Sequence, residues 1–207
     1  MFLLERAKEE CVEVFFLVLM LLLNGAIATW NAWIIGRCWP MAGSFGTKLL
    51  LVCGYVQSGI GYSSVLIVGL VLGGYGLGWL DVAVVKFAFS LWYVLVIVPL
   101  IGTGFVIWLH SVLTCIKDPS IGGFAVGAWN TYAMYSNISS AVEHLPAALE
   151  AVGEGFSGLL DSKDGWRVAL ALLIVAISIG LGFAVTHMVF RAGKARTLAE
   201  IAEEGAY

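Results

Sequence analysis

A short run of ionisable side chains in an otherwise apolar chain offers the first candidates for acid–base or metal chemistry: Glu143, His144, Glu150 and Glu154. Metal-binding helices place their ligands in patterns such as Glu-x-x-His or His-Glu-x-x-His, and neither pattern occurs here. Apolar residues recur every three or four positions from Val142 to Leu159, which is typical of one helix face. The glutamates fall outside this stripe. The pattern therefore favours a solvated acidic helix face over a catalytic or metal site.

The histidines His110 and His187 lie inside apolar segments, where a pair of histidines could bracket a haem. We expect their helices to run in opposite directions, which would place the two histidines near opposite membrane surfaces. One haem could not then use both, so local hydrogen bonds are favoured. The chain has no P-loop motif and no Gly-x-Ser-x-Gly motif, and none of its glycine runs follows a predicted strand as a dinucleotide-binding fingerprint would. The sequence therefore predicts no enzyme and no cofactor.

Uncharged polar side chains inside the apolar segments are the next candidates. An amide or hydroxyl in hydrocarbon is costly unless it is hydrogen-bonded, so these groups should face protein or water instead of lipid. They lie in the first two apolar segments: Asn24, Asn31, Gln57, Ser58, Tyr62 and Ser63. A helix-packing seam is the favoured interpretation, and a polar cavity or pore lining is the alternative.

Small residues spaced four apart form two further candidate packing faces, because small side chains let helix backbones approach closely. One face has Gly69 and Gly73; the other has Ala176, Gly180 and Ala184. The pattern leaves open whether these faces contact this chain or a neighbouring one.

The chain has four cysteines and no Cys-x-x-Cys pair, so zinc-ribbon and thioredoxin-like chemistry lack their signature. Cys38 and Cys115 are expected on the same side of the membrane. They can form a disulfide if that side is oxidising, and are otherwise free thiols. Cys11 lies beside the first apolar segment, where palmitoylation is an alternative to the favoured plain thiol.

The elements that must position these residues are membrane-spanning helices. Of the 207 residues, 60% are hydrophobic and 12% charged, with a mean hydropathy of +0.95, whereas soluble domains are about 25% charged. We expect a single-domain all-α integral membrane protein, residues 1–207, with four spans over residues 12–36, 49–72, 82–116 and 168–190. Pro99 predicts a kink in the third span, and one kinked helix is favoured over two re-entrant halves.

Residues 121–160, between the third and fourth spans, are expected to form an interfacial cap of one or two amphipathic helices. Trp129, Tyr132 and Tyr135 suit the headgroup region, and Pro146 suits the first turn of a helix. The segment also contains Asn137 in an Asn-Ile-Ser triplet, which is a glycosylation acceptor only in a secretory lumen.

Four spans and a surface cap would put both termini on one side of the membrane, which a slight positive-inside bias makes cytoplasmic. The glutamates among residues 5–13 should then lie near Arg191, Lys194 and Arg196. At exposed positions such pairs contribute about 0–1 kcal/mol each.

Small-residue faces, an interfacial cap and the lack of reactive clusters suit a protein that works through contact. We expect a non-enzymatic membrane subunit or scaffold whose partners are membrane lipid and other membrane proteins or copies of itself. The alternative is a homo-oligomeric channel or small-solute pore lined by polar residues of the first two spans. A net charge of −3 without a basic cluster argues against nucleic acid as a partner.

Overall fold

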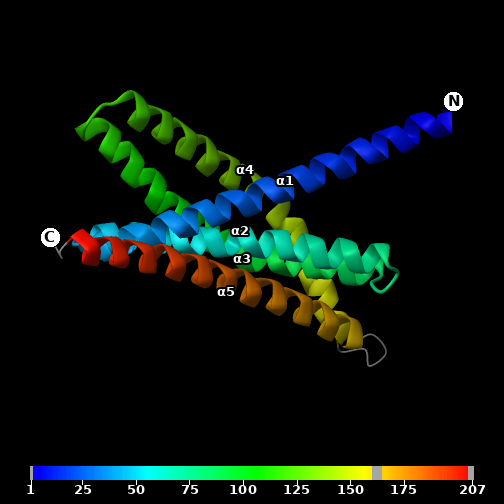
Figure 1. Cartoon of the computed structure of the whole chain (residues 1–207). Helices are drawn as coiled ribbons and strands as arrows, with labels where there is room; N and C mark the ends of the chain where they lie inside the picture. The colour runs from blue at the N-terminus through cyan, green and yellow to red at the C-terminus, as the bar shows by residue number, and fades with distance from the viewer. Residues whose placement is uncertain (1, 160–164, 205–207) are drawn as a thin grey trace.

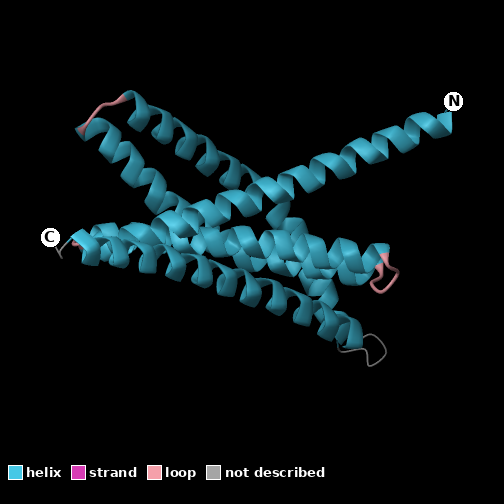
Figure 2. Ribbon diagram, in the orientation of Figure 1, coloured by secondary structure: helices cyan, strands magenta, loops and turns pink. Residues whose placement is uncertain are grey.

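The computed structural model describes the backbone of residues 2–159 and 165–204, and the side chains of residues 14–157 and 165–204. Over these residues the chain is helical apart from short turns, without strands (Figure 1, Figure 2). The elements are α1 (Phe2–Cys38), the 3-10 turn η1 (Trp39–Met41), α2 (Phe45–Gly76), α3 (Val82–Lys117), α4 (Ile121–Leu159) and α5 (Gly165–Glu204).

Within the described residues, four helices are long and apolar enough to cross a membrane. Their candidate spans are Val14–Met41, Phe45–Gly76, Val82–Lys117 and Gly165–Glu204, which belong to α1, α2, α3 and α5. These spans fit an integral multi-pass membrane protein. The predicted all-α fold with four candidate spans is thus confirmed.

Side-chain N-caps begin two of these helices, and a glycine allows the turn that joins them. The Ser44 hydroxyl accepts a hydrogen bond from the Thr47 N–H at 3.1 Å, and the Asp81 carboxylate accepts one from the Val84 N–H at 2.9 Å. Both residues therefore act as N-caps, of α2 and α3 respectively. Gly78 has a φ of +72° in the turn between these helices, a conformation that glycine adopts without steric cost.

The core lies where α2, α3 and α5 meet. Ile67 and Val71 from α2 pack with Val84 and Phe87 of α3 and with Ala171 of α5. These side chains are all buried. By contrast, the apolar residues of α1 from Val14 to Leu23 are mostly exposed, and Figure 1 shows this half of α1 projecting away from the other helices.

α3 is one helix from Val82 to Lys117, with Pro99 inside it. Proline lacks the N–H of a helical hydrogen bond, which weakens the helix locally. The Thr103 hydroxyl donates to the Pro99 carbonyl at 2.7 Å. Beyond this region, Figure 1 shows the far end of α3 and the start of α4 projecting from the remaining helices as a pair.

α4 is one helix of 39 residues, with Pro146 in its interior. The prediction that a helix begins near Pro146 is therefore wrong. α4 runs antiparallel to α3: Trp108 donates to Thr131 at 3.0 Å near one end, and Lys86 pairs with Glu154 at 3.4 Å near the other. Several residues of the apolar stripe that suggested a separate surface helix are exposed, among them Val142 and Leu149, whereas Ala141, Ala148 and Ala151 are buried.

Because α4 returns along α3, α5 begins at the same end of the array as α3. Asp81 and Arg167, at the starts of α3 and α5, form an ion pair at 3.0 Å. α5 ends beside the end of α1, where Arg37 and Glu200 pair at 2.6 Å. α5 therefore runs parallel to α1 and α3.

Figure 1 accordingly shows the two chain ends at opposite ends of the helix array. The side chains of the glutamates among residues 5–13 lie outside the described ones. The start of α1 lies at the other end of the array from Arg191, Lys194 and Arg196, so the arrangement does not support the predicted pairing of the two terminal extensions.

Candidate functional site

Hydrogen bonds between α1 and α2 join several of the predicted polar residues. The Asn24 amide nitrogen donates to the Ser64 hydroxyl at 2.6 Å, and the hydroxyls of Thr29 and Tyr62 share a hydrogen bond at 2.5 Å. Thr29 was missed by the sequence analysis, although it lies five residues after Asn24 in the same span. These contacts form a polar seam between the first two helices.

Ser58 and Ser63 lie on a different side of α2 and are 1% and 0% exposed. The Ser58 hydroxyl donates to the carbonyl of Gly54 in its own helix at 3.0 Å. The Ser63 hydroxyl accepts from the Trp92 indole N–H of α3 at 2.5 Å. Both hydroxyls are satisfied inside the protein. No pattern of residue types or spacing singled out Trp92 as a partner.

Gln57 and Asn31 lie apart from both of these clusters. The half-buried Gln57 amide nitrogen lies beside Gly104 of α3, 3.5 Å from where a Cβ on that glycine would be, and Met134 of α4 is also near. Asn31 is exposed on α1 and has no hydrogen-bond partner in the described part of the chain. The predicted polar residues therefore do not form one continuous stripe.

The predicted small-residue faces lie on the outside of the protein. No atom lies within 4 Å of where a Cβ would be at Gly69, Gly73 or Gly180, and Ala176 and Ala184 are exposed. Gly69 and Gly73 line a groove of about 410 Å³ together with side chains of α5.

Other glycines provide the close helix contacts inside the chain. A Cβ on Gly193 would lie 2.5 Å from the Trp33 carbonyl oxygen of α1, and one on Gly182 would lie 2.7 Å from the Ser63 backbone nitrogen of α2. A Cβ on Gly36 of α1 would likewise clash with the Phe190 carbonyl of α5. These glycines therefore allow α5 to approach α1 and α2, which their spacing in the sequence did not reveal.

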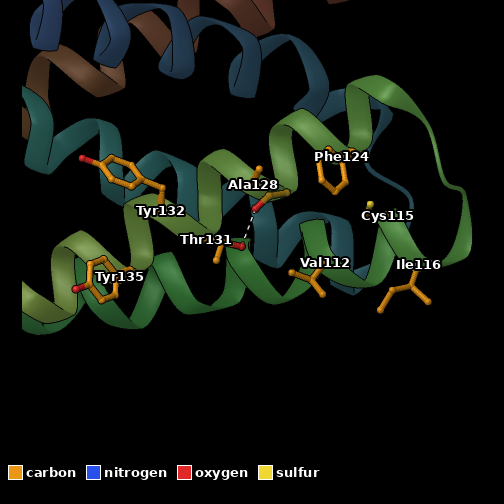
Figure 3. A pocket seen from close by; sticks show the side chains of 9 residues that line it. Val112, Cys115, Ile116, Phe124, Ala128, Thr131, Tyr132 and Tyr135 are labelled. Atoms are coloured by element: carbon orange, nitrogen blue, oxygen red, sulfur yellow. Dashed lines mark hydrogen bonds between the residues drawn. The ribbon is translucent and has the colours of Figure 1, made fainter.

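An apolar groove of about 660 Å³ lies between the projecting ends of α3 and α4 (Figure 3). Its lining residues are Val112, Cys115, Ile116, Phe124, Gly127, Ala128, Thr131, Tyr132 and Tyr135. The Thr131 hydroxyl is occupied: it donates to the Gly127 carbonyl at 2.8 Å and accepts from Trp108. No charged residue belongs to this lining, so the groove suits apolar groups.

The cysteines form no disulfide within the described residues. Cys38, Cys53 and Cys115 are free thiols, so the structure does not contain the bond considered between Cys38 and Cys115. Cys115 instead lines the groove between α3 and α4. The side chain of Cys11 lies outside the described ones.

The ionisable residues of α4 do not form a catalytic cluster. His144 and Glu143 are sequence neighbours, 3.9 Å apart and exposed, and Glu150 is also exposed. Glu154 pairs with Lys86. Within the described chain, no group of three or more His, Cys, Asp and Glu side chains is arranged to hold a metal ion.

The histidines inside the spans, His110 and His187, have separate local partners. The Nε2 atom of His110 lies 3.5 Å from the Thr114 hydroxyl in its own helix, and the Nδ1 atom of His187 lies 3.5 Å from the Tyr55 hydroxyl of α2. The expectation that their helices run in opposite directions is wrong, because α3 and α5 run parallel (Figure 1). The local hydrogen bonds agree with the favoured interpretation.

Comparison with known proteins adds no relative from which a role could be transferred: the chain matches no family model, no curated protein and no solved structure. Its function must therefore be argued from its own contacts and surfaces.

Proposed function

We propose that this protein is a non-enzymatic integral membrane subunit or scaffold. Its outer helix faces pack against other membrane proteins, or against copies of itself, within a larger assembly in lipid. The observation that carries this proposal is the outward position of the two small-residue faces, around Gly69 and Gly73 on α2 and around Gly180 on α5.

The contrast with the internal glycines supports this role. Where α5 approaches α1 and α2, the chain places glycine against neighbouring backbone, at Gly193 and Gly182. The outer faces have the same kind of residue but no neighbour. A small-x-x-x-small stripe lets a second helix approach closely, and van der Waals packing then drives helix association in lipid.

The alternative proposal is a homo-oligomeric channel or small-solute pore lined by polar residues of α1 and α2. It requires those side chains to contact water. Asn24 and Tyr62 instead bond across the α1–α2 seam, and Ser58 and Ser63 are buried. These contacts favour the packing interpretation over the pore.

Native mass spectrometry after gentle extraction tests the proposal. The wild-type protein should be recovered with further chains, at a mass above the 22.2 kDa of one chain. Gly180→Leu and Gly69→Leu should reduce that mass, because a leucine side chain would hold the partner helix away from the stripe.

Gly102→Leu is the matched control. Gly102 is also exposed on a spanning helix, with no atom within 4 Å of a Cβ, but Val98 and Val106 stand four residues from it instead of small residues. This variant should keep the wild-type mass. Recovery of the wild type as a single chain, or equal masses for all the variants, would contradict the proposal.

A further inference from the structure

We infer that α4 crosses the membrane as a fifth span, and that its outer face over Ile121–Val142 contacts the hydrocarbon chains of the bilayer. This arrangement differs from a cap on the membrane surface, and it places the two chain ends on opposite sides of the membrane. The inference depends on α3 crossing the membrane once and does not depend on the proposed assembly role.

The pairing of α4 with α3 is the first argument. Contacts join the two helices from Trp108 and Thr131 near one end to Lys86 and Glu154 near the other. A helix that lies on the membrane surface would cross a spanning helix at a steep angle and meet it over a short length. α4 instead follows α3, so it occupies the same depth in the membrane.

The composition of the segment is the second argument. No charged residue occurs between Asp118 and Glu143. At about 1.5 Å per residue, the helix from Ile121 to Val142 is about 33 Å long, which matches the hydrocarbon core of about 30 Å. Glu143 and His144 then begin the charged segment that follows it.

The exposed side chains of this segment suit lipid. Large apolar and aromatic side chains are exposed along its whole length: Ile121, Phe124, Val126, Trp129, Tyr132, Tyr135, Ile138 and Val142. The segment also contains uncharged polar side chains, namely the half-buried amides of Asn130 and Asn137 and the exposed hydroxyls of Tyr132, Ser136 and Ser139. They lower its hydropathy but add no charge.

Pro146 supports the same boundary. Proline has no N–H, so it leaves the carbonyl of Val142, four residues earlier, without its helical partner. An unpaired carbonyl costs several kcal/mol in hydrocarbon but little in water. Val142 is exposed and directly precedes Glu143, so its carbonyl lies beside the charged segment.

Cysteine labelling in sealed vesicles tests the inference directly. The parent variant replaces every native cysteine by alanine: Cys11, Cys38, Cys53 and Cys115. Single cysteines are then introduced as Lys117→Cys and Glu150→Cys, at exposed positions on either side of the uncharged segment. A membrane-impermeant maleimide is added outside the vesicles, before or after permeabilisation.

The two cysteines should label from opposite faces: one in intact vesicles, and the other only after permeabilisation. Val126→Cys, inside the uncharged segment, should lose labelling under both conditions. Labelling of Lys117→Cys and Glu150→Cys from the same face would overturn the inference and restore the surface cap.

A second measurement keeps the native cysteines in place, so it does not require the cysteine-free variant to fold. Epitope tags at the two chain ends are exposed to protease outside sealed vesicles. Five crossings predict that one tag is cut and the other protected. Equal protection of both tags would overturn the inference.

Discussion

The close contact between α1 and α5 allows a sharp test of the packing through Gly193→Ala. The methyl group of the new alanine would lie 2.5 Å from the Trp33 carbonyl oxygen, about 1 Å closer than the 3.4 Å at which ordinary contact begins. The neighbouring atoms belong to backbone, at Trp33 and Arg37, and cannot turn away as a side chain could. The two helices must therefore separate.

The expected magnitude follows from two opposing effects. Overpacking a well-packed contact costs about 1–3 kcal/mol, whereas replacing glycine by alanine inside a helix gains up to about 1 kcal/mol. Gly102→Ala on α3 provides the matched control, because open space surrounds Gly102 and it lies outside the proposed assembly faces. It should show the helix gain alone. The difference in free energy of unfolding between the two variants isolates the steric cost, about 1–3 kcal/mol.

Equilibrium unfolding in mixed detergent micelles measures both variants, with loss of helical circular dichroism as the signal. Gly193→Ala should unfold at a lower denaturant fraction than Gly102→Ala. If the two variants are equally stable, α1 and α5 do not approach as closely as the structure indicates, and the reasoning fails.

Two further expectations concern polar contacts. Asn24→Leu removes the hydrogen bond to Ser64 and should lower the free energy of unfolding in the same assay by about 0.5–2 kcal/mol. Asn31→Leu, at an exposed position, should not destabilise the protein, and a larger loss for Asn31→Leu than for Asn24→Leu would refute the α1–α2 seam. A double-mutant cycle on Arg37 and Glu200, whose side chains are 37% and 31% exposed, should give a coupling energy of about 0.2–1 kcal/mol. A coupling energy that does not fall with added salt would argue against a surface ion pair.

Composition and hydropathy were sufficient to predict the all-α class and the four candidate spans. The reason is physical: a helix that spans lipid needs a long apolar run whichever helices it also packs against, so its sequence alone identifies it. The N-caps at Asp81 and Ser44 are also local signals, since such residues commonly cap the helices that follow them, although they were not among the predictions.

The positions of the candidate site residues could not be predicted in the same way. Gly193 and Gly180 are the same residue type on the same helix, yet one faces backbone and the other open space. Spacing shows which residues share a helix face but not which neighbour that face meets. Gln57 and Ser58 illustrate the same limit, since adjacent residues of α2 face different helices.

The polar residues of α4 explain why hydropathy does not count it among the spans. A hydropathy scale treats each side chain as if it were surrounded by lipid. In the structure, Thr131 bonds to Trp108, and Ser140 bonds to the Tyr93 hydroxyl at 3.2 Å, so α3 satisfies both groups. A polar group that a neighbouring helix satisfies costs little in hydrocarbon. A helix paired along its length can therefore cross with lower hydropathy than one whose apolar residues are mostly exposed, as those of α1 from Val14 to Leu23 are. The number of crossings thus depends on contacts between helices as well as on the composition of each one.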